Sequence, residues 1–199
     1  MNHPLQCQCG KIKGYVIRPG MAERAVCYCK DCRAFARFLG QADTVLDAQG
    51  GTPIVATLPG QVHFLRGLDS LACMSLSDRG LLRWYAGCCK TPIGNTPRDF
   101  KMPYVGLVEN CLHGDAPSLQ ESFGPVRAVL NTKSSAEGHV KSTPVSKSLS
   151  LLKIMKSVIA ARLNGSYRRN PFFETAAGTP IVQPRVLTKT ERERVTDGA

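Results

Sequence analysis

The chain has 199 residues, 43% of them hydrophobic and 21% charged, and a formal net charge of +11. These values fit a globular protein of one domain, or of one domain with an extension, and exclude wholesale disorder. No apolar run is long enough to span a bilayer, and the first residues lack the basic start and apolar stretch of a secretion signal, so we expect a cytoplasmic protein.

The chain opens with a pair of cysteines in the segment Cys7-Gln8-Cys9-Gly10. In an extended strand residues i and i+2 project to one side, so Cys7 and Cys9 can present both sulfurs to one ion at about 2.3 Å. Nine cysteines occur in all. Clustered thiols in a reducing compartment are more often metal ligands or catalysts than disulfides, and the odd number argues against a closed disulfide framework.

A second group of cysteines follows in the segment Cys27-Tyr28-Cys29-Lys30-Asp31-Cys32. Three thiolates converge here on a tight turn that enters a short helix, which we expect from Arg33 to Leu39. Three protein ligands leave the fourth position of a tetrahedral ion open for water or a substrate sulfur, which is the arrangement of a catalytic zinc site. The start of the helix favours the anionic form of the thiols.

Short β-type runs, separated by glycine and proline, make up much of the first two thirds of the chain. They are Lys11–Ile17, Ile54–Leu58, Val62–Leu65 and Leu81–Tyr85. We therefore predict a mainly β domain over residues 1–130.

The last cysteine pair of this domain is Cys88-Cys89. A structural zinc site needs four soft ligands, so this pair would complete a site begun by Cys7 and Cys9. Neighbouring residues in a regular strand point to opposite faces, so both can bind one ion only across a kink, which favours Cys89 over Cys88 as a ligand. Two alternatives stay open: all seven clustered cysteines form purely structural sites, or some are small buried apolar residues.

The composition changes at residues 131–147, where serine, threonine, lysine and glycine predict a linker to a C-terminal extension, residues 148–199. Apolar residues at helical spacing predict an amphipathic helix over residues 148–163, ended by Asn164-Gly165. These apolar residues are Leu151, Leu152, Met155, Val158, Ile159 and Leu163. Prolines and a charged end predict an extended arm from residue 166 onward. Residues 131–199 hold 12 Lys and Arg against 5 Asp and Glu, so the basic excess lies mostly there.

The cysteine motifs together resemble those of the glutathione-dependent formaldehyde-activating (GFA) enzymes, a family that includes the CENP-V-type proteins. The resemblance runs through C-x-C-G at residues 7–10, C-x-C-x-x-C-R at residues 27–33, and a late stretch at residues 77–92. It covers the first 100 or so residues of the chain and rests on the order and separation of the three motifs.

The late stretch departs from the family pattern, which usually reads S-x-x-G-x-x-R-x-F-C-x-x-C-G-T-P. Ala86 stands in the place of the first cysteine, and Cys88 comes one residue before the second. Lys90 replaces the usual glycine. Cys88 is therefore either a substitute fourth ligand or a free thiol.

The resemblance implies a β-tent fold of coiled antiparallel sheets that holds two zinc ions. It implies a structural zinc at the first and last cysteine groups, and a substrate-facing zinc at Cys27, Cys29 and Cys32. The implied activity is carbon–sulfur lyase chemistry, typified by adding the thiol of glutathione to formaldehyde. Lys30 and Arg33 would meet the carboxylates of glutathione.

We therefore expect a zinc-dependent carbon–sulfur lyase that acts on a small thiol such as glutathione and on an aldehyde. The alternative is a non-catalytic zinc-binding module whose basic tail binds nucleic acid or another acidic partner. The tail has few aromatic residues beyond Tyr167, Phe172 and Phe173, so the signal for a nucleic-acid partner is weak.

Overall fold

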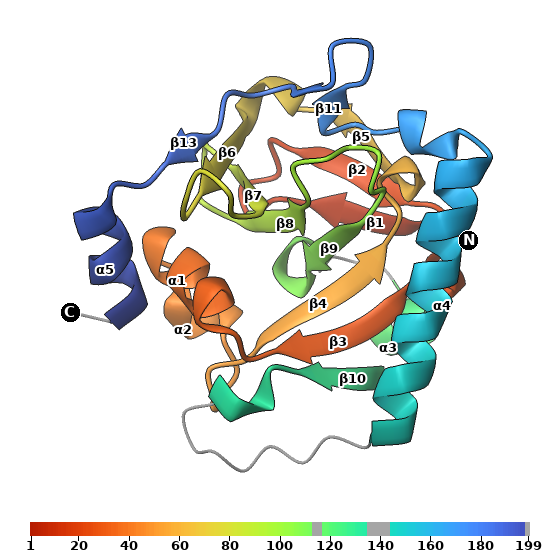
Figure 1. Ribbon diagram of the computed structural model, residues 1–199, viewed down its shortest axis with the longest axis horizontal. Coiled ribbons are helices and arrows are strands. Elements are labelled where there is room, and N and C mark those ends of the chain that lie inside the picture. The colour runs from red at the N-terminus through yellow and green to blue at the C-terminus, as the bar shows by residue number, and fades with distance from the viewer. Residues whose placement is uncertain (113–116, 135–143, 198–199) are drawn as a thin grey trace.

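A computed structural model of the protein describes residues 1–112, 117–134 and 144–197. Within these ranges the chain is mainly β, with 13 strands and five α-helices, as the sequence predicts. Figure 1 shows the larger sheet in the middle of the molecule, with α1 and α2 at one side and α4 along the other.

The strands form two main sheets and one short pair. The large sheet has the order β10-β3-β4-β9-β8-β7-β6-β13, the small sheet has the order β1-β2-β5, and β11 pairs with β12. The strands of the large sheet are β3 (Glu23–Cys27), β4 (Thr52–Thr57), β6 (Leu71–Ser75), β7 (Leu82–Ala86), β8 (Pro92–Thr96), β9 (Val105–Val108), β10 (Val126–Leu130) and β13 (Arg185–Val186). The other strands are β1 (His3–Gln6), β2 (Lys13–Val16), β5 (Val62–Arg66), β11 (Phe173–Glu174) and β12 (Thr179–Pro180). The helices are α1 (Lys30–Phe38), α2 (Ala42–Val45), α3 (Leu119–Phe123), α4 (Pro144–Leu163) and α5 (Lys189–Asp197).

One face of the large sheet packs against the small sheet. Side chains that share this face include Val55, Leu107 and Trp84, which lie in register across β4, β9, β8 and β7. They join Leu5 and Val16 of the small sheet in the main hydrophobic core. Burial of these apolar side chains stabilises the stacking of the two sheets.

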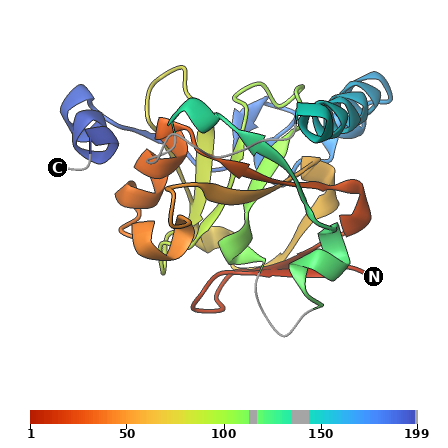
Figure 2. The ribbon, with the colours of Figure 1, turned by 90° about the horizontal axis from the view of Figure 1, so that it is seen from below.

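The opposite face of the large sheet carries the helices. Ala56, Gly106, Asn95 and Arg83 are successive register partners and so project from this face. Helix α4 packs over the Ala56 end of this row. Helix α1 packs over the other end, where the ring of Phe35 lies 5.5 Å from the Arg83 guanidinium. Figure 2 shows α1 and α4 well separated along the sheet, so a stretch of its face lies between them.

The local elements follow the sequence closely. Strands β2, β4, β5 and β7 occupy the four predicted β runs. Helix α1 begins earlier than predicted, at Lys30 rather than Arg33, because the Cys29 sulfur caps it by accepting the amide of Cys32 at 3.4 Å.

Helix α4 is the predicted amphipathic helix, and Gly165, with a φ of 75°, lies just beyond its end. Of the predicted apolar stripe, only Val158 is buried. The buried apolar residues are Ile154, Val158 and Ala161, whereas Leu151, Leu152, Met155, Ile159 and Leu163 are exposed. The buried carboxylate of Glu23 fixes the rotation of the helix, because it accepts hydrogen bonds from Lys153 at 2.6 Å and Ser150 at 2.9 Å.

The segment after α4 packs into the core of the β domain. Phe172 is fully buried, with its ring centroid 5.1 Å from that of Trp84 and 5.7 Å from that of Phe64. Of the predicted linker, residues 132–134 form a short 3-10 turn, and residues 135–143 lie outside the described ranges. In the described part of the chain, no helix combines the length and apolarity that crossing a membrane requires.

The extended arm predicted from residue 166 onward is wrong at its end, where α5 forms. A capping box starts this helix: Thr188 Oγ1 accepts the Glu191 amide at 3.3 Å, and the Glu191 carboxylate accepts the Thr188 amide at 2.9 Å. Arg37 of α1 closes the other end by donating to the carbonyl of Thr196 at 2.7 Å. The T-x-x-E pattern at residues 188–191 is the sequence signal that predicts the helix.

Because Phe172 fills the core of the β domain, Phe172→Ala should lower the free energy of unfolding by about 3–5 kcal/mol. Leu163→Ala is the matched control, since Leu163 is 83% exposed and its truncation should cost under about 0.5 kcal/mol. Urea unfolding of both variants measures the difference. Equal stability of the two variants would show that the extension does not contribute to the core.

Candidate metal centres

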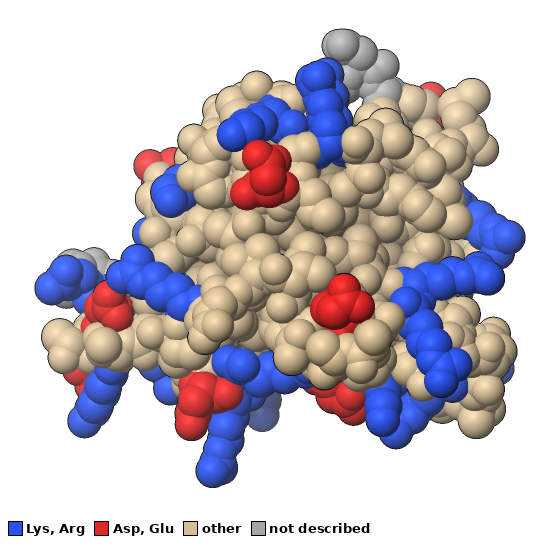
Figure 3. Space-filling model, turned by 90° about the horizontal axis from the view of Figure 1, so that it is seen from above, with Lys and Arg blue, Asp and Glu red and all other residues tan. Residues whose placement is uncertain are grey.

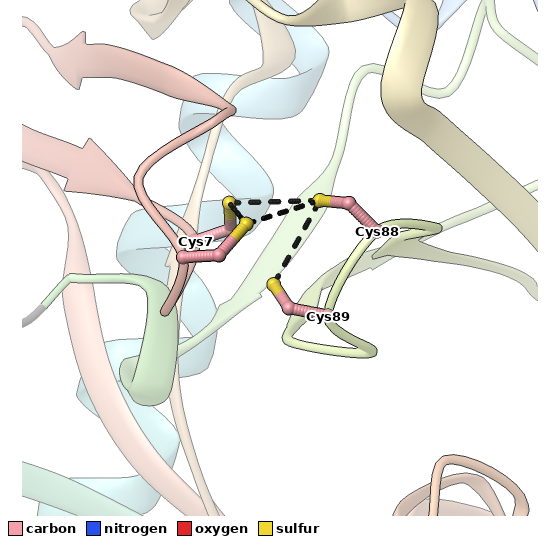
Figure 4. Close-up of side chains that lie close together, drawn as sticks. Cys7, Cys88 and Cys89 are labelled. Carbon is pink, nitrogen blue, oxygen red and sulfur yellow. Dashed lines mark hydrogen bonds between the residues drawn. The ribbon is translucent and has the colours of Figure 1, made fainter.

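The first and last cysteine groups meet at one point. The sulfurs of Cys7, Cys9, Cys88 and Cys89, the four-cysteine cluster, all lie within 4.8 Å of one another. Cys7 and Cys9 are 3.6 Å apart, and Cys88 lies 4.0 Å from Cys7, 3.4 Å from Cys9 and 3.8 Å from Cys89 (Figure 4). A metal–sulfur distance of about 2.3 Å gives tetrahedral edges of about 3.8 Å. The donor set therefore fits one tetrahedral ion.

Cys88 and Cys89 both reach this point because they lie in a turn after β7 rather than within a strand. The amide of Lys90 closes the turn by donating to the carbonyl of Ala86 at 2.8 Å. Lys90 has a φ of 61°, in the left-handed region that glycine adopts without strain. The turn supplies the kink that two neighbouring ligands need, so both sulfurs belong to the cluster and neither is favoured over the other.

Hydrogen bonds to sulfur surround the four-cysteine cluster. The amide of Ile12 donates to the Cys7 sulfur at 3.2 Å. Thr91 Oγ1 accepts the amide of Gln8 at 2.9 Å and lies 3.1 Å from the Cys89 sulfur, so its own proton is free to point at that sulfur. Burial raises the pKa of Cys89, but hydrogen bonds from Thr91 and from backbone amides outweigh it and lower this pKa to about 6. These donors favour the thiolate that a metal ion requires.

The middle cysteine group forms a second cluster on the helix-covered face of the large sheet. Cys27 ends β3, Cys29 caps α1 and Cys32 lies in the first turn of α1. Their sulfurs, the three-cysteine cluster, lie within 4.8 Å of one another. In the described ranges this group offers three potential ligands, which leaves one position of a tetrahedral ion without a protein donor. Cys29 is partly exposed while the other two are buried, so the open side lies toward Cys29.

One thiolate is shared by the three sulfurs. Hydrogen bonds from Cys29 and Cys32 lower the pKa of Cys27 well below its ordinary value. Asn131, with a φ of 56°, supports this thiolate by donating from Nδ2 to the Cys27 sulfur at 3.4 Å. The same hydrogen bonds with Cys27 raise the pKa values of Cys29 and Cys32, so both keep their protons at neutral pH.

A tyrosine lies beside the three-cysteine cluster. A Cβ atom at position 106 would lie 2.9 Å from the Tyr104 hydroxyl, so Gly106 makes room for the phenol on the sheet face. Burial raises the pKa of Tyr104 to about 12, and the negative charges of Cys27 and Cys32 add to the rise. The phenol therefore keeps its proton at neutral pH.

Arg83 of β7 is the other ionisable group at this cluster. Its side chain is only 2% exposed. Nη1 donates to Asn95 Oδ1 at 3.0 Å, and Nη2 lies 3.8 Å from the carboxylate of Asp31. Hydrogen bonds with Cys27 and Cys29 raise the pKa of Cys32, and the positive charge of Arg83 opposes that rise.

The structure brings together all seven cysteines that the sequence singled out, in the two groups expected. Lys30 is exposed at the first helical position of α1, and Arg33 is partly buried beside Gly50, so their contact with a substrate stays a prediction. The sequence analysis missed Arg83 and Tyr104. Tyr104 directly precedes β9 and reaches the cluster only through the fold, whereas Arg83 stands at the arginine of the S-x-x-G-x-x-R-x-F-C pattern, a signal that could have identified it.

The comparisons with known proteins identify a family. The family described as "Family of unknown function (DUF6151)" matches residues 1–183, a stretch that runs across the predicted linker. No curated protein matches the chain. A crystal structure of a Rhodobacter sphaeroides protein, a structural genomics target, is similar at 19% identity, with a TM-score of 0.42, over 63% of this chain and 98% of that one.

If both clusters bind metal, the purified chain should hold two ions, and Cys29→Ser should hold one while keeping its fold. Replacing Cys9 or Cys89 should instead unfold the domain, because a closed metal site contributes its binding energy to folding. Elemental analysis and circular dichroism measure both effects. Full metal content in Cys29→Ser would show that the three-cysteine cluster binds no metal.

Metal binding at the three-cysteine cluster should depend on pH. At neutral pH Cys27 is already a thiolate, whereas Cys29 and Cys32 have raised pKa values and must each lose a proton. The second ion should therefore release about two protons, and its affinity should rise about 100-fold for each pH unit between about 6 and 8. The measurement starts from chain whose four-cysteine cluster already holds an ion. Metal is then added in the presence of a competing chelator at each pH, and the slope of affinity against pH is compared with this value. A flat profile would contradict the shared-thiolate arrangement.

Proposed function

Because the chain belongs to the Family of unknown function (DUF6151), we propose a function from the two clusters themselves: a zinc-dependent protein that forms or breaks a carbon–sulfur bond between a small thiol and an aldehyde. The observation that carries the proposal is a set of three convergent sulfurs whose fourth partner is missing among the described residues. A second, complete set of four sulfurs stands apart from it.

The two clusters favour zinc, and each would hold an ion with a different role. Thiolate-rich tetrahedral sites select soft or borderline ions, and zinc is the common choice for four cysteines. The four-cysteine cluster would hold a structural ion that ties the β1–β2 turn to the turn after β7. The three-cysteine cluster would hold an ion with room for one further ligand.

A zinc ion held by the three-cysteine cluster would lower the pKa of a bound thiol, so that the thiol loses its proton at neutral pH. The reaction joins the thiol sulfur to the aldehyde carbon and transfers one proton to the carbonyl oxygen. Tyr104 keeps its phenol protonated at neutral pH, and on this proposal it would donate that hydrogen bond or proton. Holding both reactants at one site lowers the entropic part of the barrier.

A small cavity lies between α4 and the large sheet, and on this proposal it would receive the aldehyde, although no cysteine lines it. It has a volume of about 70 Å³, and Ile54, Ala128, Leu130 and Tyr104 are among the residues that line it. The first three pack in one apolar cluster with Cys27 and Cys32. This space is far below the roughly 300 Å³ or more of a pocket for a drug-sized ligand. It suits formaldehyde or another very small aldehyde.

The proposal includes the fold and the substrate of the GFA family. Its support is the order of the three cysteine motifs along the chain and the meeting of the first and last of them at one point. On this proposal the sheets form a β-tent, the thiol is glutathione or a similar compound, and Lys30 and Arg33 face the thiol substrate.

The alternative of a nucleic-acid-binding tail has less support. Figure 3 shows basic side chains dispersed around the rim of one face with acidic ones among them, rather than gathered in one patch. Three basic residues of the tail are paired with acidic ones: Lys153 with Glu23 at 2.6 Å, Arg185 with Glu191 at 2.6 Å and Lys189 with Glu193 at 3.9 Å. The alternative would require nucleic-acid binding that falls steeply with salt in a filter-binding assay.

The proposal predicts that the zinc-loaded chain accelerates the addition of a thiol to formaldehyde, and that Cys29→Ser loses about 100-fold or more of this activity. Cys73→Ala is the control, because it removes a buried thiol that belongs to neither cluster. Nuclear magnetic resonance exchange between free and adduct formaldehyde measures the rate. Full activity in Cys29→Ser with unchanged zinc content would defeat the proposal.

A further inference from the structure

Arg83 is a buried cation with unfilled hydrogen-bonding capacity. Its side chain is 2% exposed, and its Nε has no hydrogen-bond partner in the described part of the chain. Nη1 is satisfied by Asn95 Oδ1 at 3.0 Å. A buried donor without a partner, on a charged group, destabilises the protein unless a ligand completes it.

The unfilled side of the guanidinium is the edge formed by Nε and Nη2. The nearest charged partner of Nη2 is the carboxylate of Asp31, at 3.8 Å, which is beyond hydrogen-bonding distance. A carboxylate that approaches this edge can accept two parallel hydrogen bonds, which is the strongest geometry that arginine offers. The Cζ atom of Arg83 lies over the ring of Phe35, 5.5 Å from the ring centroid, so this ring contacts the guanidinium without accepting a hydrogen bond from Nε.

The Asp31 carboxylate marks the side from which a ligand arrives. Its side chain is 53% exposed, whereas that of Arg83 is 2% exposed, so the pair joins the buried guanidinium to the surface. Asp31 stands between Cys29 and Cys32 in the first turn of α1. An anion that replaced it at the guanidinium would therefore lie next to the three-cysteine cluster.

We propose that Arg83 binds a carboxylate of the substrate through Nε and Nη2, so that the three-cysteine cluster takes a thiol that carries a carboxylate in preference to one that does not. This inference rests on the proposed function, because it presumes that a thiol binds at that cluster. It assigns carboxylate recognition to a buried arginine of β7, in addition to the exposed Lys30 and partly buried Arg33 of α1.

The test uses the full chain loaded with cobalt(II), whose absorption reports sulfur ligation without any turnover. It is titrated with 3-mercaptopropionate and with 3-mercaptopropanol, which differ only in the acid group. The carboxylate thiol should bind about tenfold or more tightly. Arg83→Met should bind the two thiols about equally. The preference should persist in the control Arg79→Met, where an exposed arginine is lost.

A second variant keeps the test decisive if Arg83→Met does not fold. Asp31→Asn removes the carboxylate that competes for Nη2, so it should increase the preference for 3-mercaptopropionate several-fold. Equal binding of the two thiols to the unaltered chain, or an unchanged preference in Asp31→Asn, would overturn the role of Arg83 while leaving the proposed function intact. If neither thiol changes the cobalt spectrum, the proposed function fails and this inference fails with it.

Discussion

Seven sulfur atoms held at two points are the feature on which the rest of the account depends. Four of them come from turns at opposite ends of the first 89 residues and lie within 4.8 Å of one another, close enough to surround one tetrahedral ion. Only the stacking of the small sheet on the large one brings those turns together. A metal ion at this point would therefore link the two sheets and add its binding energy to folding.

The three-cysteine cluster differs from the four-cysteine cluster both in its number of sulfurs and in the residues around it. Its three cysteines lie on the helix-covered face, where Tyr104 and Arg83 supply a neutral donor and a buried positive charge. A buried thiolate such as that of Cys27 is stabilised by a nearby positive charge and by hydrogen-bond donors. On the proposed function, the same groups would also position an incoming thiol and aldehyde.

The sequence predicted features that are encoded within a few neighbouring residues. It missed contacts that form only when distant strands pair. The spacing of the cysteines located both clusters, because neighbouring ligands are encoded within a few residues. The contact of Arg83 with Asn95 could not be found in this way, since the two meet only when β7 pairs with β8. The predicted buried stripe of α4 was wrong except at Val158, because the helix is rotated so that Ile154 and Ala161 are also buried and Glu23 accepts hydrogen bonds from Lys153 and Ser150.

The most direct test of the account is the location of metal in crystals of the protein purified without added ions. Anomalous scattering measured on both sides of the zinc absorption edge should give two peaks, one at the centre of the four-cysteine cluster and one beside Cys27, Cys29 and Cys32. The absence of both peaks from well-ordered crystals, or zinc bound only by other residues, would contradict it.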